Sequence, residues 1–92
     1  MATVEQAQGI IARIVQAIVD QPEAVILTIH GESPRLVLSI WLASEDFGRV
    51  IGKQGRTARS IRTIALGMGM KSGIRLSLDF KEAPLGPNKS QA

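Results

Sequence analysis

The sequence has no cysteine, no tyrosine and no long apolar run. The absence of cysteine excludes disulfide bridges, thiolate metal ligands and a thiol nucleophile. No apolar stretch approaches the roughly 20 residues that a membrane-spanning helix needs. Residues 1–6 lack the basic start and the apolar run of a secretory signal. These absences lead us to expect a soluble, cytoplasmic protein without a membrane span.

Aromatic and catalytic residue types are also scarce. The aromatic side chains are Trp41, Phe47 and Phe80, and packing within strands or helices accounts for each of them. So few rings argue against nucleic-acid recognition on an aromatic platform. The single histidine, His30, stands alone at a strand end, and no nucleophile–base pair or metal-ligand cluster is visible. We therefore expect no enzyme, no cofactor and no bound metal.

Acidic residues are missing from one long segment. Residues 1–46 contain two basic and six acidic side chains, whereas residues 47–78 contain seven basic side chains and no acidic one. A single basic face is the electrostatic pattern expected of a nucleic-acid-binding protein. The alternative interpretation is an ordinary solvated helix surface. This alternative is weaker here, since the charges flank a glycine loop that also suits anions.

Apolar periodicity predicts six elements. They are a helix from Val4 that ends by Gln21, strands over 24–30 and 35–43, a helix over 44–51, a helix that begins near Gly55, and a strand over 74–80. Thr3 and Gln6 match a capping box for the first helix, and Ser44 matches an N-cap for the second. Glu45 and Asp46 follow in the first turn, where the helix dipole accounts for two acids without catalysis.

The same periodicity predicts which side chains face the core. In the first helix these are Val4, Ala7, Ile11, Ile14 and Ile18, and in the third helix they are Ala58, Ile61, Ala65 and Met68. Gly67, Gly69 and Gly73 are expected to end the third helix and turn the chain. One three-stranded sheet with the helices packed on one face would bury these stripes, which predicts an α+β domain over residues 1–82. The composition of residues 83–92 indicates a flexible tail.

The most informative segment is the glycine loop Gly52-Lys53-Gln54-Gly55, which lies between two predicted helices. Such a bend exposes backbone N–H groups at the start of the following helix, where they suit phosphate. A nucleotide-binding P-loop is excluded, because only three residues separate Gly48 from Gly52, Gln54 stands where a hydroxyl is needed, and the loop follows a helix. Glycines that merely permit a tight junction between helices are the remaining structural alternative.

The longer run from Val50 to Ile61 resembles the signature of KH domains, in which an apolar pair, a Gly-x-x-Gly loop and spaced apolar helix positions recur. Ala58 stands where many KH domains carry isoleucine, and alanine still packs. The preceding helix and two strands suggest the type II arrangement, α-β-β-α-α-β. Three segments, Val19–Glu23, Glu45–Arg56 and Ser60–Thr63, resemble the small stand-alone bacterial KH proteins of the KhpA family. The resemblance covers roughly residues 3–81.

The resemblance implies both a fold and a function. The fold is a type II KH domain whose loop clamps the backbone of short single-stranded RNA, in a protein that is not an enzyme. The family also implies a homodimer or a heterodimer with a larger KH protein of the KhpB or Jag type, and roles as an RNA chaperone or in post-transcriptional regulation. The RNA-binding residues expected on this basis are Gly48, Arg49, Ile51, Gly52, Lys53, Gln54, Gly55, Arg56 and Arg59.

Residue chemistry supports the same site. Backbone N–H groups from Gly52 to Arg56 would meet phosphates, and Arg49, Arg56 and Arg59 would line the approach. Bases would lie in an apolar groove between the second and third helices and the edge of the sheet. The competing hypothesis is a dimerisation or scaffold module for a larger KH-containing partner, because 45% of so small a chain is apolar.

Overall fold

The computed structural model describes residues 4–83, except for the side chain of Lys53. Its elements are α1 (Val4–Ile18), the 3-10 turn η1 (Pro22–Ala24), β1 (Ile26–Glu32), β2 (Arg35–Leu42), α2 (Ser44–Ile51), the 3-10 turn η2 (Lys53–Gly55), α3 (Arg56–Lys71) and β3 (Arg75–Glu82). This order, with one three-stranded sheet, confirms the expected α+β fold. The predicted capping residue Thr3 and residues 84–92 of the predicted tail lie outside the described residues.

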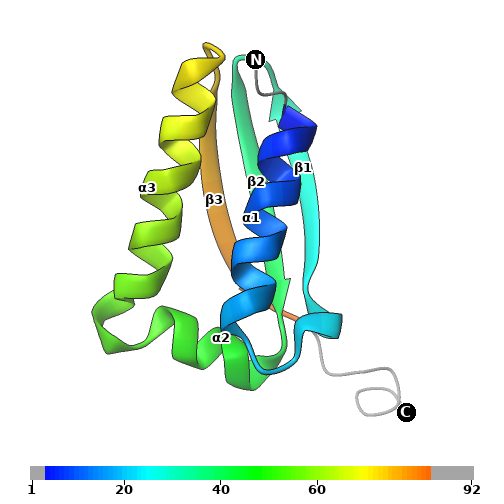
Figure 1. The fold of residues 1–92 in the computed structure, drawn as a ribbon, viewed down its shortest axis with the longest axis vertical. Coiled ribbons are helices and arrows are strands. Elements are labelled where there is room, and N and C mark those ends of the chain that lie inside the picture. The colour runs from blue at the N-terminus through cyan, green and yellow to red at the C-terminus, as the bar shows by residue number, and fades with distance from the viewer. Residues whose placement is uncertain (1–3, 84–92) are drawn as a thin grey trace.

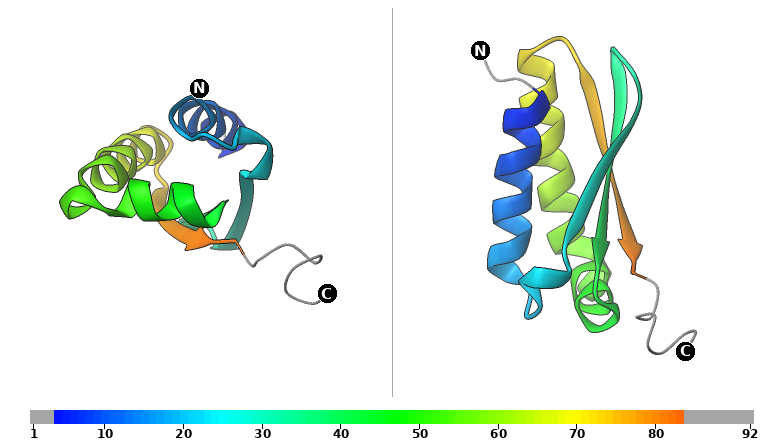
Figure 2. Two further views of the ribbon diagram at one scale, coloured as in Figure 1. Left: turned by 90° about the horizontal axis from the view of Figure 1, so that it is seen from below. Right: turned by 90° about the vertical axis from the view of Figure 1, so that its right-hand side faces the viewer.

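The sheet has the strand order β1-β2-β3, so β2 is central and β3 is an edge strand. β1 and β2 form an antiparallel hairpin, whereas β2 and β3 run parallel, with Leu38 opposite Leu78. α1 and α3 lie along one face of the sheet, and α2 crosses its lower end (Figure 1, Figure 2). The parallel pair needs a long crossover connection. Here α2 and α3 form that crossover, and the glycine loop lies between them.

The core lies between the sheet and the helices. Leu38, Ile40 and Leu42 of β2 belong to it and are fully buried. Ser39, on the other side of the strand, is fully buried as well, and its hydroxyl lies 2.7 Å from His30 Nε2. The other buried apolar residues are Ala7, Ile11, Val15, Val19, Val50, Ala58, Ile61, Ala65, Leu76, Leu78 and Phe80. α3 contributes small side chains at Ala58 and Ala65, which lets this helix pack close to the large side chains of the strands.

The buried side of α1 differs from its predicted stripe at the end of the helix. The periodicity predicts Ile18 inside the core, yet this residue is 47% exposed and Val15 and Val19 are buried instead. Burial follows steps of four residues from Ala7 through Ile11 to Val15. Ile18 is the last residue of α1, where the chain turns away toward η1, so its side chain is covered on fewer sides.

The first strand begins later than predicted. Residues 22–24 form η1, and the Val25 N–H donates to the Pro22 carbonyl oxygen at 3.2 Å. These residues therefore close a turn instead of pairing in the sheet. β1 then extends to Glu32, so the hairpin turn shortens from the predicted four residues to Ser33 and Pro34.

The start of α2 also differs from the prediction. Ser44 is the first residue of the helix rather than its N-cap, and Ala43 occupies the cap position without a side-chain hydrogen bond. The Ser44 hydroxyl donates to the Glu82 carboxylate at the end of β3 instead. This contact fastens the start of α2 to the edge strand of the sheet.

α3 continues through Gly67 and Gly69 to Lys71, so the prediction that these glycines end the helix is wrong. Gly69 is buried where the helix meets the chain that enters β3. A Cβ at this position would lie 2.5 Å from the Ile74 carbonyl oxygen and 2.9 Å from the Leu76 Cβ. The Ile74 N–H donates to the Gly69 carbonyl oxygen at 2.8 Å. Gly69 thus serves close helix–strand packing rather than helix termination.

Candidate nucleic-acid interface

The glycine loop joins α2 to α3 through a tight bend. The Gly52 N–H donates to the Gly48 carbonyl oxygen at 2.8 Å, and the Gly55 N–H donates to the Gly52 carbonyl oxygen at 3.0 Å. A Cβ on Gly52 would lie 2.8 Å from the Gly48 carbonyl oxygen. Real Cβ atoms do not come so close to another heavy atom, so the bend needs glycine at its first position.

The middle of the loop lies in the left-handed backbone region. Gln54 has φ 64° and ψ 20°, and Gly55 has φ 67° and ψ 24°. Glycine adopts this region without strain, whereas glutamine seldom does. The Arg59 guanidinium donates to the Gln54 carbonyl oxygen at 3.1 Å and ties the loop to α3. Non-glycine residues in this conformation persist only where the surroundings hold them, and they cluster at ligand-binding loops.

The start of α3 is open to an anion. Gly55 occupies the N-cap position, and no side chain forms a capping hydrogen bond there. The first N–H groups of a helix have no acceptor within the helix, and they form the positive end of its dipole. Arg56 and Arg59 are exposed beside this end. N–H groups and guanidinium groups together suit a phosphate.

The structure narrows the set of loop amides that can meet a phosphate. The sequence predicts the N–H groups from Gly52 to Arg56, but that of Gly52 donates to the Gly48 carbonyl oxygen of α2 and that of Gly55 to the Gly52 carbonyl oxygen. The N–H groups of Lys53, Gln54 and the first turn of α3 are the remaining candidates. The side chain of Gln54 is exposed. The side chain of Lys53 lies outside the part of the chain that the structure describes.

A shallow groove runs between α3 and the edge strand β3. One hollow has a volume of about 240 Å³ and is lined by Arg62, Leu66, Arg75, Leu76, Ser77 and Leu78. A neighbouring hollow of about 350 Å³ is lined by Leu66, Met70, Gly73, Ile74 and Arg75. The sequence predicts a groove bounded by two helices and the sheet edge. The structure places the hollows along α3 and β3.

Arg62 and Arg75 line this groove, and the sequence analysis predicts neither of them as a site residue. The Arg62 Nε donates to the Leu78 carbonyl oxygen at 3.5 Å, and its guanidinium carbon lies 5.6 Å from the centre of the Phe80 ring. Arg62 therefore spans the groove from the helix to the strand. Both arginines lie in the segment 47–78 that has no acidic residue, so the sequence indicates that they belong to a basic surface. It does not show which basic residues of that segment face the groove.

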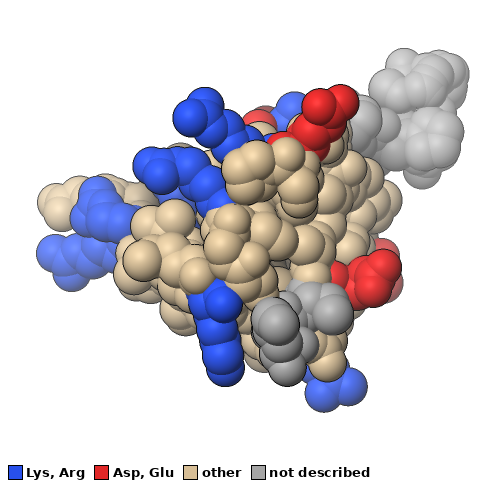
Figure 3. All heavy atoms as spheres, turned by 90° about the horizontal axis from the view of Figure 1, so that it is seen from above, with Lys and Arg blue, Asp and Glu red and all other residues tan. Residues whose placement is uncertain are grey.

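Basic side chains gather on the side of the molecule formed by α3. Figure 3 shows most of the visible Lys and Arg side chains on that side and acidic ones mainly away from it. Arg56, Arg59 and Arg62 all project from α3 and are exposed. The charge separation along the sequence is thus also a separation in space, which favours approach of a polyanion.

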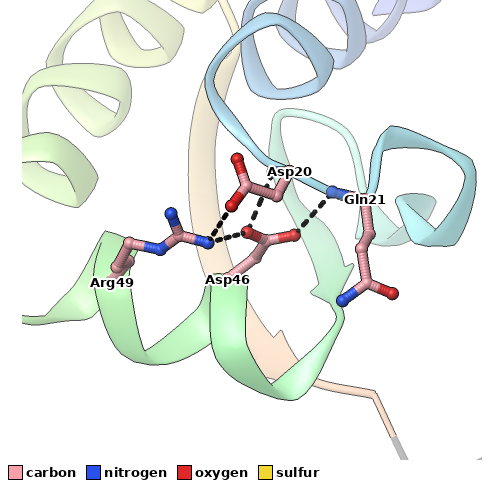
Figure 4. A network of polar contacts seen from close by, with 4 residues as sticks. All are labelled: Asp20, Gln21, Asp46 and Arg49. Atoms are coloured by element: carbon pink, nitrogen blue, oxygen red, sulfur yellow. Dashed lines mark hydrogen bonds and ion pairs between the residues drawn. The ribbon is translucent and has the colours of Figure 1, made fainter.

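Arg49, on α2, is paired with two acidic side chains. Its guanidinium points toward the end of α1, where one nitrogen is 2.7 Å from an Asp20 oxygen and 2.9 Å from an Asp46 oxygen (Figure 4). The hydrogen bond from Arg49 to Asp20 and the charge of that carboxylate raise the pKa of Arg49, and Asp46 adds to the effect. The sequence places Arg49 on the approach to the loop, whereas the structure pairs it with two acids.

The other predicted site residues lie on α2. Gly48 is exposed, with open space where a side chain would be, and Ile51 is half-buried against the core. Val50 is 5% exposed and belongs to the core. Ile51 is therefore the member of the apolar pair that reaches the surface beside the loop. Within residues 4–83, no helix is both long enough and apolar enough to cross a membrane.

Known proteins resemble this chain over nearly its whole fold. The sequence model of one family, described as "KhpA/KhpB, KH domain", matches residues 8–80. The RNA-binding protein KhpA of Listeria monocytogenes serovar 1/2a is 40% identical over 75 residues, which are 82% of this chain and 99% of the relative. The protein of the same name from Caldanaerobacter subterraneus subsp. tengcongensis is 38% identical over 72 residues, 77% of this chain and 95% of the relative. That from Chlamydia trachomatis serovar D is 33% identical over 72 residues, 78% of this chain and 92% of the relative.

Proposed function

Because the chain belongs to the KhpA/KhpB family of KH domains, we propose that it binds short single-stranded RNA through the loop Gly52–Gly55. The observation that carries the proposal is the uncapped start of α3, which lies beside Arg56 and Arg59. The names of the relatives agree with it, since each is called an RNA-binding protein. The role is one of binding rather than catalysis, as an RNA chaperone or a post-transcriptional regulator.

In this proposal the loop holds the RNA backbone. The amides of Lys53, Gln54 and the first turn of α3 donate to phosphate oxygens, while Arg56 and Arg59 supply positive charge. A KH loop of this kind clamps four nucleotides of backbone. The left-handed backbone of Gln54 and Gly55 supports this role, because it makes the tight bend that leads directly into the start of α3.

The bases lie in the groove between α3 and β3. Leu66 and Met70 are 39% and 68% exposed there, so apolar surface is available to the faces of bases. Arg62 and Arg75 flank this surface and supply hydrogen-bond donors to base edges or to phosphates. The polar side chains that line the two hollows are Arg62, Arg75 and Ser77. We expect so small a set to contact many sequences rather than one, which suits a chaperone.

The test is the salt dependence of RNA binding. Contacts with three or four phosphates predict that the logarithm of the association constant falls with the logarithm of salt concentration with a slope of about −2 to −3. Fluorescence anisotropy with a labelled single-stranded RNA of about 12 nucleotides measures this slope. Arg56→Gln should make the slope shallower by about 0.7, because one phosphate contact is lost. No binding at low salt would refute the proposal.

A second role, as a docking module for another KH protein, has support from exposed apolar side chains away from the groove. Ile10, Ile18, Ile26 and Ile64 are 44–56% exposed. When a partner covers an exposed isoleucine, its apolar surface is removed from water, and this favours association. Ile10 and Ile18 lie on α1, Ile64 on α3 and Ile26 on β1. We propose that the chain pairs through one of these exposed faces with itself or with a KhpB-type partner.

Light scattering tests the second role. A self-associating chain should show a mass near twice its 9.9 kDa. Ile64→Glu should shift the population toward the monomer, because a charge would then be buried in the contact. A monomer that neither self-associates nor captures a KhpB-type KH protein would exclude this role, whatever its affinity for RNA.

A further inference from the structure

Asp46 is a buried carboxylate that joins two distant parts of the chain. It is 2% exposed, although it lies in the first turn of the short helix α2. One oxygen accepts the Asp20 N–H and the other accepts the Gln21 N–H, each at 3.0 Å. Arg49, one turn further along α2, donates to the first of these oxygens at 2.9 Å (Figure 4). The carboxylate therefore fastens the start of α2 to the segment that follows α1.

α2 needs such an anchor to keep its orientation. A helix of eight residues is not stable by itself, so tertiary contacts decide where it lies. Val50 is buried in the core near the end of α2, and Phe47 and Ile51 pack against that core. At its start, Ser44 binds Glu82 of β3, and Asp46 binds the segment that follows α1. Gly52 lies six residues beyond Asp46, or about 9 Å along the helix axis. A rotation of α2 by about 10° at Asp46 would thus displace the loop by roughly 1.5 Å.

The same contacts remove Arg49 from the basic surface. Two carboxylates, Asp20 and Asp46, surround one guanidinium, so the three side chains carry a net negative charge. A phosphate gains little from an arginine whose charge is already balanced in this way. Arg49 instead supplies the positive charge that stabilises Asp46, since a buried carboxylate without a partner for its charge is destabilising.

We propose that Asp46 and Arg49 are positioning residues of the RNA site, which hold α2 so that the Gly52–Gly55 loop can receive a phosphate. Neither side chain touches RNA. Both act through the orientation of α2. The proposal rests on the proposed RNA binding, and it removes Arg49 from the residues that contact the phosphates.

The experiment compares four variants of the full chain with the wild type. Asp46→Asn would place a side-chain amide against a buried backbone N–H and destabilise the fold. Arg49→Gln changes only the exposed partner of Asp46, so it is the primary variant. Arg13→Gln removes the same charge from the exposed face of α1 and is the matched control. Arg56→Gln represents a phosphate contact. Each variant is measured by anisotropy with the same single-stranded RNA over a range of salt, at a temperature where thermal unfolding shows it to be folded.

Arg49→Gln is expected to weaken RNA binding with an unchanged salt slope. If the competent orientation of α2 falls to about 20% of molecules, the apparent Kd rises about fivefold. Arg56→Gln should instead make the slope shallower by about 0.7, and Arg13→Gln should alter neither quantity appreciably. In the absence of RNA, the backbone amide NMR signals of Gly52 and Gly55 should move in Arg49→Gln and stay in place in Arg13→Gln. Arg49→Lys should recover part of the affinity, because lysine keeps the charge but lacks the planar fork.

Two results would overturn the inference while RNA binding stands. An affinity of Arg49→Gln equal to that of Arg13→Gln would show that the cluster does not position the loop. A slope that is shallower by about 0.7 in Arg49→Gln would show that Arg49 contacts a phosphate directly. If the wild-type chain binds no RNA even at low salt, the proposed function fails first and the inference fails with it.

Discussion

Replacing Gly69 by alanine is expected to lower the free energy of unfolding by about 2 kcal/mol or more. The new Cβ would lie 2.5 Å from the Ile74 carbonyl oxygen and 2.9 Å from the Leu76 Cβ, so α3 and the start of β3 must move apart. That movement strains the hydrogen bond from the Ile74 N–H to the Gly69 carbonyl oxygen. Alanine also favours the helix by up to about 1 kcal/mol, which offsets only part of the strain.

Gly67 provides a matched control two residues away on the same helix. It is exposed, and a Cβ there would have nothing within 4 Å. Gly67→Ala should therefore stabilise the protein by up to about 1 kcal/mol through helix propensity alone. Urea unfolding followed by circular dichroism gives both values, and the midpoints should move in opposite directions. Equal small effects of the two substitutions would indicate that α3 is frayed beyond Gly67 and does not pack against β3 at Gly69.

Gly69 also matters for the groove. The close approach of α3 to the start of β3 brings Leu66 and Met70 beside Ile74 and Arg75 in one hollow. Helix–strand spacing at this end therefore sets the shape of the surface that we propose for bases. A loss of RNA affinity in folded Gly69→Ala would be a consequence of the changed groove, since the loop lies at the other end of α3 (Figure 1).

Local sequence patterns predict most of the fold because each element satisfies its own periodicity. The alternation of Leu38, Ile40 and Leu42 is sufficient to identify β2 and its buried face. Errors arise where a residue has two possible roles. Gly69 is a helix breaker by propensity, yet contact with β3, which no local pattern reveals, makes it necessary inside the helix.

The part of the candidate site that lies close together in sequence could also be predicted from local patterns. The loop glycines and the arginines of α3 are neighbours in sequence, so a motif and a charge count locate them. Asp46 and Asp20 are 26 residues apart, and only the fold brings them together around Arg49. The sequence therefore groups Arg49 with the basic segment, and the structure separates it. Arg62 and Arg75 lie on different elements, and their common groove is likewise a product of the fold.

The double substitution Lys53→Asp with Gln54→Asp is expected to weaken RNA binding by at least about 100-fold. It changes the charge of the loop by three units at the place proposed for phosphates. One unit charge about 6 Å from a phosphate contributes roughly 0.7 to 2.8 kcal/mol, depending on the local dielectric. Aspartate also tolerates the left-handed conformation of Gln54 better than most residues, so the bend itself should persist. Anisotropy with single-stranded RNA measures the loss.

A control must separate the loop from the overall charge. Arg13→Glu with Gln16→Glu makes the same change of three units at two exposed positions of α1. Long-range attraction would weaken equally in both double variants, whereas contact with the loop is lost in only one. We expect the α1 variant to lose no more than about tenfold at 0.15 M salt, where the Debye length is about 8 Å. Similar losses in both variants would mean that net charge, and not the loop, governs binding, and wild-type affinity in a folded loop variant would place the RNA site elsewhere.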